Sequence, residues 1–211
     1  MTALSEDTRA HGVAVCWSCK GPTDAAALFC ATCGAVQPPG QANHFARLGL
    51  PRVFALDLAV LDRAYFDRQR QLHPDRFARK TPRERAIAES QAASLNGAYE
   101  TLRDPLRRAG HLLALAGHPL IDDHQTIDDP ALLAEAMEGR EALMEAEDAA
   151  AVAAVDVKAT GDRDAAMTAL GAALAAKDWS AARRLAMRCR YLGKLLEDAR
   201  RRRGQLEGRA A

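Results

Sequence analysis

Prolines divide the middle of this chain into segments of helix length. Pro51, Pro74, Pro82, Pro105 and Pro119 separate stretches that are rich in alanine, leucine and charged residues. Because proline lacks a backbone N–H and clashes with the preceding helical turn, each position is expected to end or begin a helix. Alanine is the best helix former and a poor strand residue, so packed helices are favoured over sheets.

Residues 57–72 are predicted to form the first long helix, with Asp57 capping its first turn. At the helical period, one arc collects the apolar side chains Leu58, Leu61, Tyr65 and Leu72. The opposite arc carries the charged side chains Arg63, Asp67 and Arg70. This helix is therefore expected to bury an aliphatic and aromatic side and to expose a partly basic one.

A second helix is predicted over residues 83–102. Along one stripe of it lie Ile87, Gln91, Leu95, Ala98 and Leu102, with Tyr99 beside them. Two helices that each carry one apolar stripe, joined by a short loop, most simply pack as an antiparallel pair.

The last part of the chain is alanine-rich and predicts three more helices. Asp128 and Asp129 before Pro130 are typical of a helix start, and this helix should end near Asp148. Two further helices are expected near residues 149–176 and 178–203, with Gly171 or Asp178 as the break between them. Amphipathic helices of this length form a small bundle.

The predicted fold class is all-α, apart from a cysteine-containing segment at the N-terminus. Three domains are expected: residues 1–42 as a tail, cysteine module and linker, residues 43–118 as a helical-hairpin domain, and residues 119–211 as the three-helix bundle. The linker is suggested by the loop-forming run Gln37-Pro38-Pro39-Gly40.

Four cysteines form two C-x-x-C pairs, Cys16 with Cys19 and Cys30 with Cys33. Two thiolates three residues apart on a tight turn can reach one ion, and two such turns complete a tetrahedral site. A structural zinc is predicted; iron, a labile cluster and a redox dithiol are the alternatives that the spacing leaves open. Four protein ligands leave no position for a substrate, so a catalytic metal is not expected. The remaining Cys189 is expected to be a buried, unreactive thiol.

The tripeptide His73-Pro74-Asp75 follows the first long helix and favours binding over chemistry. Pro74 ends the helix and stiffens the chain, so that His73 and Asp75 are presented at defined positions. Asp75 offers a carboxylate to an arginine of a partner. A basic surface that would attract an acidic partner is formed by Arg63, Arg70, Arg76 and Arg79. No catalytic residue is predicted, and the chain is not expected to be an enzyme.

Near its end the second predicted helix carries the run Asn96-Gly97-Ala98-Tyr99-Glu100-Thr101-Leu102-Arg103-Asp104-Pro105. With the tripeptide lying between two helices, this run resembles the J domain. The J domain stimulates ATP hydrolysis by a 70-kDa heat-shock chaperone and supplies no catalytic group itself. The resemblance implies that the chaperone-binding residues are His73, Pro74, Asp75, Arg63, Arg70 and Arg76.

Four further segments, residues 44–51, 56–57, 69–77 and 105–113, resemble the HscB (Jac-type) co-chaperones of iron–sulfur cluster assembly. The similarity covers about residues 45–205, and the cysteine pairs resemble the metal-binding extension of the eukaryotic members. This implies that the bundle holds the iron–sulfur scaffold protein, IscU, and presents it to the specialised chaperone HscA. The scaffold-binding positions implied are Leu133, Ala134, Met137, Glu138, Arg140, Glu141 and Tyr191. An ordinary bundle core is the alternative interpretation of the Leu133 and Met137 stripe.

Four residues depart from the family pattern. Ala134 replaces a bulky methionine, and Gly139 stands mid-helix where the family has a large apolar residue. His111 stands where tyrosine is preferred. Arg68 takes a usually aliphatic position, from which its charge is expected to reach solvent at the edge of the buried side.

Charge and hydropathy narrow the alternatives. A net charge of +1 argues against a protein that mainly neutralises phosphate backbones. The run from Arg200 to Arg203 is interpreted as a solvated helix end that compensates the macrodipole. No apolar run approaches a membrane span and no leader is recognisable, so a soluble, cytoplasmic protein is expected. A J protein of a general DnaK-class chaperone and a zinc-ribbon nucleic-acid-binding protein are the alternative hypotheses.

Overall fold

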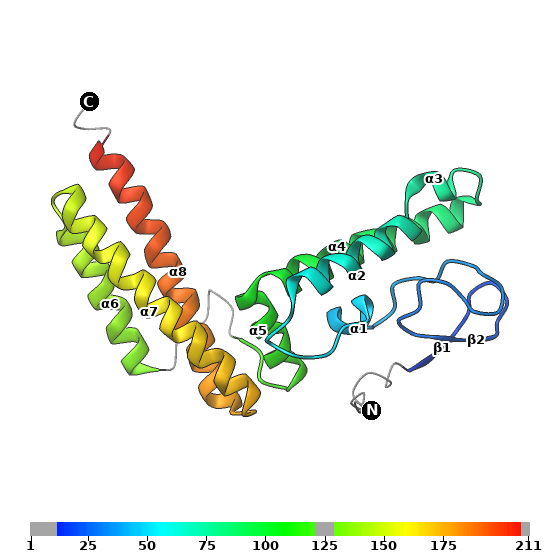
Figure 1. Ribbon diagram of the computed structural model, residues 1–211, viewed down its shortest axis with the longest axis horizontal. Coiled ribbons are helices and arrows are strands. Elements are labelled where there is room, and N and C mark those ends of the chain that lie inside the picture. The colour runs from blue at the N-terminus through cyan, green and yellow to red at the C-terminus, as the bar shows by residue number, and fades with distance from the viewer. Residues whose placement is uncertain (1–11, 121–128, 208–211) are drawn as a thin grey trace. The chain divides into compact units, whose positions relative to one another are not determined.

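The computed structural model describes residues 12–120 and 129–207, so Asp128 lies outside the described residues. The chain divides into two compact units, residues 1–108 and 109–211 (Figure 1). The cysteine module belongs to the first unit together with the hairpin helices. The finer division at residues 42 and 43 stays a prediction.

The two long helices predicted before residue 105 are found close to their predicted ranges, and the helical content confirms the fold class. The first unit contains α1 (His44–Leu48), α2 (Leu58–Gln71), α3 (Pro74–Phe77) and α4 (Pro82–Arg103). α5 (Pro105–Leu115) begins in the first unit and ends in the second. Asp57 caps α2 as expected, because its carboxylate accepts hydrogen bonds from the N–H groups of Ala59 and Val60. A capping box of Thr81 and Glu84 begins α4.

The core of the hairpin lies between α1, α2 and α4. Leu61, Leu95 and Leu102 are fully buried, as predicted from their arcs. Leu58 is 46% exposed, so the prediction that it belongs to the buried side was wrong. Leu58 is the first residue of α2. Because helical side chains lean toward the N-terminus, its side chain extends past the start of the helix and away from the buried side. Arg68 crosses the edge of this core, with its guanidinium over Gly49 at the left-handed end of α1.

Two three-residue strands lie in the cysteine module. They are β1 (Val13–Val15) and β2 (Pro22–Asp24), which pair antiparallel in the register Val13 to Asp24. A bridge between Phe29 and Val36 closes the second cysteine turn.

A buried polar chain joins this module to the helices. The side-chain amide of Gln91, in α4, donates a hydrogen bond from Nε2 to the backbone carbonyl of Gln37 at 2.7 Å. Its Oε1 accepts a hydrogen bond from the Arg47 guanidinium at 3.5 Å. Arg47 also donates to the carbonyls of Pro39 and Ala42 at 2.7 and 3.1 Å. All three side chains are buried. A buried amide or guanidinium without a hydrogen bond would lower the stability of the fold. These hydrogen bonds therefore hold the cysteine module and α1 against α4.

The second unit is a bundle of α6 (Pro130–Glu145), α7 (Ala149–Ala175) and α8 (Trp179–Glu207). Asp129 caps α6 as predicted. The break before α8 falls at Asp178, and Gly171 continues α7. The bundle core consists mainly of leucine and alanine side chains, among them Leu132, Ala136, Leu143, Leu192, Leu195 and Leu196, together with Val152.

The arginine run near the C-terminus lies within α8, which continues to Glu207 and so passes the predicted end at residue 203. Arg202 donates a hydrogen bond to the carbonyl of Ala146, the C-cap residue of α6, at 3.3 Å. This guanidinium therefore compensates the carbonyl end of α6.

Among the described helices, none combines the length and the apolar character that would be needed to cross a membrane.

Replacing Leu102 by alanine should lower the free energy of unfolding of the first unit by about 3 kcal/mol, because the deletion leaves a cavity at a fully buried site. Leu58→Ala is the matched control and should cost less than about 1 kcal/mol. Urea unfolding followed by Trp17 fluorescence, in a Trp179→Phe background, measures both. Equal costs would contradict the assignment of the buried side.

Candidate functional site

The tripeptide lies on a single exposed turn between the hairpin helices. α2 ends at Gln71, and Pro74 is the first residue of the short helix α3, not part of an irregular loop. His73 caps α3: its Nδ1 accepts from the N–H of Asp75 at 3.4 Å and lies 3.4 Å from the Asp75 carboxylate. The side chains of His73 and Asp75 are 59% and 90% exposed. Both polar groups are therefore held by local geometry and remain open to a partner.

The basic residues predicted beside the tripeptide are exposed. Arg63 and Arg70 lie on the outer side of α2, and Arg76 lies on α3. Arg70 forms an ion pair with Asp67 one turn away, which orients its guanidinium. Phe66, on the same helix, is 55% exposed between Arg63 and Arg70 in sequence. This aromatic was not singled out from the sequence, because an apolar residue on a charged arc carries no distinctive pattern.

The run that ends α4 acts inside the hairpin. Tyr99 stacks on Tyr65 with ring centroids 4.1 Å apart, and its hydroxyl donates to Asp62 at 2.9 Å. Asn96 accepts hydrogen bonds from Tyr65 and Gln69 of α2 at 3.0 and 2.9 Å. These contacts hold α2, and with it the tripeptide, against α4.

The four cysteines converge as predicted. Their sulfur atoms all lie within 4.8 Å of one another, with Cys16 and Cys33 3.7 Å apart and Cys19 and Cys30 3.8 Å apart. The edge of a tetrahedron of sulfurs about 2.3 Å from a central ion is about 3.8 Å. The residue after each pair, Lys20 or Gly34, has a left-handed backbone, which turns the chain tightly below the sulfurs. The group therefore fits a tetrahedral metal ion.

Hydrogen bonds within the turns tune the sulfur atoms. Burial disfavours the Cys16 thiolate, but hydrogen bonds from the N–H groups of Cys19 and Ser18 and from the Cys33 and Cys30 side chains together outweigh it and lower the pKa of Cys16 to about 6. The side-chain amide of Gln37 also donates to the Cys16 sulfur at 3.3 Å. A thiolate in this position is ready to bind a cation.

The cysteine module contacts the hairpin at Trp17, which lies inside the first cysteine turn. The Trp17 indole N–H donates to the Val36 carbonyl at 2.6 Å, and the Arg83 guanidinium lies 4.2 Å above the ring. Trp17, Gln37 and Gln91 thus link the cysteine group to α4. Sequence reasoning missed this role of the three residues, because their partners lie far away along the chain.

The scaffold-binding positions predicted on α6 lie on its outer face. Leu133 is 43% and Met137 64% exposed, while Leu132, Ala136 and Leu143 provide the buried side. The same outer face carries the exposed side chains of Ala134, Glu138, Arg140 and Glu141. The core interpretation of the Leu133 and Met137 stripe was therefore wrong. Met144, two turns beyond Met137 and 80% exposed, extends this stripe and was not predicted.

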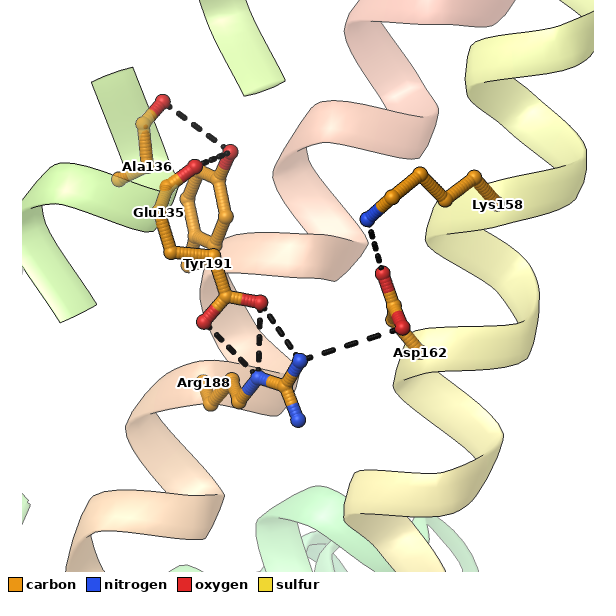
Figure 2. A network of polar contacts seen from close by, with 6 residues as sticks. All are labelled: Glu135, Ala136, Lys158, Asp162, Arg188 and Tyr191. Carbon is orange, nitrogen blue, oxygen red and sulfur yellow. Dashed lines mark hydrogen bonds and ion pairs between the residues drawn. The ribbon is translucent and has the colours of Figure 1, made fainter. Parts of the chain in front are cut away.

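Tyr191 is not part of that exposed face. It is 9% exposed, and its hydroxyl donates to the carbonyls of Glu135 and Ala136 at 3.2 and 3.1 Å (Figure 2). A direct contact of Tyr191 with a scaffold protein stays a prediction. Of the remaining sequence candidates, Cys189 is buried, and burial raises the pKa of its thiol, as expected for an unreactive cysteine.

Comparison with known proteins bears on both units. A co-chaperone protein HscB homolog from Vibrio cholerae is 39% identical over 170 residues, which cover 79% of this chain and 99% of the relative. The chain belongs to the HscB co-chaperone family. Residues 128–200 match the family model described as the HSCB C-terminal oligomerisation domain.

Solved HscB structures share the fold. The chaperone HscB from Vibrio cholerae has a TM-score of 0.67 at 37% identity, over 78% of this chain and 99% of that one. The crystal structure of human co-chaperone protein HscB has a TM-score of 0.80 at 29% identity and covers 89% of this chain and 97% of its own. Residues 43–211 are only about four fifths of this chain, whereas the human structure matches 89% of it. The human match therefore extends into the cysteine module.

Replacing Cys30 by serine should abolish tight metal binding, from about one ion per chain to nearly none, because three thiolates no longer close the tetrahedron. The same variant should lower the melting temperature of the first unit, since the module is bonded to α4 through Gln37 and Gln91. Metal content by elemental analysis and melting by circular dichroism measure these effects. Cys189→Ser is the control and should retain the metal; loss of metal there would contradict the site.

Proposed function

We propose that this HscB-family chain stimulates the ATPase of an HscA-like chaperone and delivers an IscU-like iron–sulfur scaffold protein to it. The observation that carries the proposal is the division of α6 into two sides. Its outer side exposes Leu133 and Met137 although the bundle core is complete without them. An exposed apolar stripe with charged residues beside it is the usual anatomy of a protein interface.

The chaperone-binding surface is proposed to be the turn that carries His73, Pro74 and Asp75, with Arg63, Arg70 and Arg76. Asp75 is almost fully exposed, and among the described residues only His73 approaches its carboxylate, so little competes with an incoming arginine. The exposed arginines attract an acidic chaperone surface and speed the encounter. ATP and the hydrolytic groups belong to the chaperone, so this chain acts by binding and not by chemistry.

The metal ion is proposed to be a structural zinc. Four thiolates in a closed tetrahedral arrangement suit zinc, and they leave no coordination position for a substrate. Cys16, Cys19, Cys30 and Cys33 would hold the ion and fix the two turns that carry Trp17 and Val36. A module of this size cannot bury enough apolar surface to fold by itself, so the ion would supply the missing stability.

Single-turnover ATP hydrolysis by an HscA-type chaperone tests the first part of the proposal. The native protein should accelerate hydrolysis, and His73→Gln should reduce this stimulation by at least about tenfold, the equivalent of one charge-assisted contact. His118→Gln replaces an exposed histidine outside the surface and should stimulate normally. Equal activity of the native and His73→Gln proteins would overturn the assignment. Equal stimulation of a general DnaK-class chaperone would favour that partner instead.

Scaffold binding is tested on the α6 stripe. A Leu133→Ala and Met137→Ala double variant should weaken binding of an IscU-type protein by about a hundredfold, as for central apolar anchors of an interface. Stimulation of the chaperone in the absence of scaffold should be unchanged. Val157→Ala removes a similarly exposed apolar side chain from α7 and should leave the affinity as it is. Calorimetry measures the affinities, and an unaltered affinity of the double variant would exclude this stripe as the docking face.

A further inference from the structure

Tyr191 is hydrogen-bonded to the backbone of α6 from the core side of the helix. Its ring belongs to the bundle core, and its hydroxyl lies 3.2 and 3.1 Å from the carbonyl oxygens of Glu135 and Ala136. Burial and the nearby Glu135 carboxylate raise the pKa of Tyr191, so the hydroxyl keeps its proton and remains a donor at neutral pH. These carbonyls already accept hydrogen bonds within α6, and the hydroxyl uses their second lone pairs.

Gly139 makes this approach possible. A Cβ atom at Gly139 would lie 2.2 Å from the Tyr191 hydroxyl oxygen and 2.8 Å from Cδ2 of Leu195. The side chain of a helical residue leans over the carbonyls three and four positions earlier, which for Gly139 are those of Ala136 and Glu135. Any larger residue would therefore occupy the place of the hydroxyl. This explains why a glycine stands in the middle of α6.

Glu135 is held a second time by α8. The Arg188 guanidinium donates to the Glu135 carboxylate through Nε at 2.9 Å and Nη2 at 2.6 Å (Figure 2). On its other side, Arg188 lies 4.0 Å from Asp162 of α7, which is paired with Lys158 at 2.7 Å. The network joins α6 to both other helices and borders a surface hollow of about 230 Å³ next to Gly139.

These polar contacts weigh heavily because the apolar contribution of α6 is small. α6 provides three buried side chains, Leu132, Ala136 and Leu143, whereas α8 provides nine. Leu133 and Met137 are on the opposite side of the same two turns that Tyr191 and Arg188 hold. Since a helical turn is stiff, the depth and rotation of α6 at Glu135 and Ala136 also determine where Leu133 and Met137 stand.

We propose that Tyr191 and Gly139 are positioning residues for the docking face of α6. The Tyr191 hydroxyl sets the distance between α6 and α8, and Gly139 provides the space for that hydroxyl. This distance determines where Leu133 and Met137 are presented to the partner. Tyr191 thus contributes to scaffold binding through α6 and not by touching the scaffold. This inference rests on the proposed scaffold function and names the residues that control its affinity.

A compensating pair of substitutions in the full-length protein tests this proposal. Gly139→Ala should weaken binding of an IscU-type scaffold protein by about tenfold, because the new methyl group and the hydroxyl cannot occupy the same space. Tyr191→Phe alone should weaken it by about threefold, since α6 loses its bond to α8. In the double variant the hydroxyl is absent and the nearest ring atom, Cζ, lies at an ordinary 3.5 Å. The terminal methyl group of Leu195, 2.8 Å from the new Cβ, is still there and has to turn aside. The affinity should therefore recover most of the way to that of Tyr191→Phe.

Amide hydrogen exchange of α6 provides a second readout that does not depend on the scaffold. Exchange over residues 133–145 should accelerate in Gly139→Ala and recover in the double variant, while α7 stays protected. Gly161→Ala is the matched control, because this mid-helix glycine of α7 has no neighbour within 4 Å of a new Cβ. It should leave both exchange and affinity unchanged.

The outcomes separate the two proposals. A native protein that binds no scaffold refutes the proposed function, whatever α6 does in the exchange experiment. Native binding that is insensitive to Gly139→Ala refutes the positioning role alone. A double variant that binds more weakly than Gly139→Ala also refutes it, because Tyr191 would then contribute through its own contact with the scaffold.

Discussion

The buried side-chain amide of Gln91 is the contact on which the first unit depends. It lies in α4 and bonds to the Gln37 carbonyl of the cysteine module and to Arg47 of α1. Each of these groups is buried, and leaving one without a hydrogen bond would be destabilising. The cysteine module, α1 and α4 are therefore expected to unfold together. The cysteine turns are consequently part of the structure that supports the hairpin, and Gln37 reaches from this contact to the Cys16 sulfur.

Both proposed partner surfaces follow one physical pattern. The groups offered to a partner are exposed and make few contacts of their own. Asp75 on α3 and Met137 on α6 are examples. Their positions are set by polar contacts that hold the same helix, or the helix next to it in the chain, against its neighbour. Tyr99 and Asn96 hold α2 in this way, and Tyr191 holds α6. A protein that acts by binding a partner gains specificity from such preorganisation, because less entropy is lost when the partner binds.

Local signals made most of the fold predictable. Asp57, Asp129 and Asp178 cap helices by bonding to N–H groups two or three residues away, so their effect is readable from neighbouring positions. The doubled C-x-x-C pattern predicted the sulfur cluster for the same reason. The three-residue strands of the module escaped prediction because they are too short for a period to show. The first residue of α2 was misassigned because a helical wheel ignores where the helix ends.

The sequence by itself determined the order and approximate limits of α2, α4, α6, α7 and α8, the cysteine group and the place of the tripeptide. These features depend on spacing within a turn or two, where chain connectivity restricts the geometry. Only the tertiary structure decided which side of α6 is buried, that Gln91 serves the cysteine module, and that Gly139 makes room for the Tyr191 hydroxyl. Each of those contacts joins residues more than fifty positions apart. Such partners are chosen by the packing of whole helices, which no local pattern records.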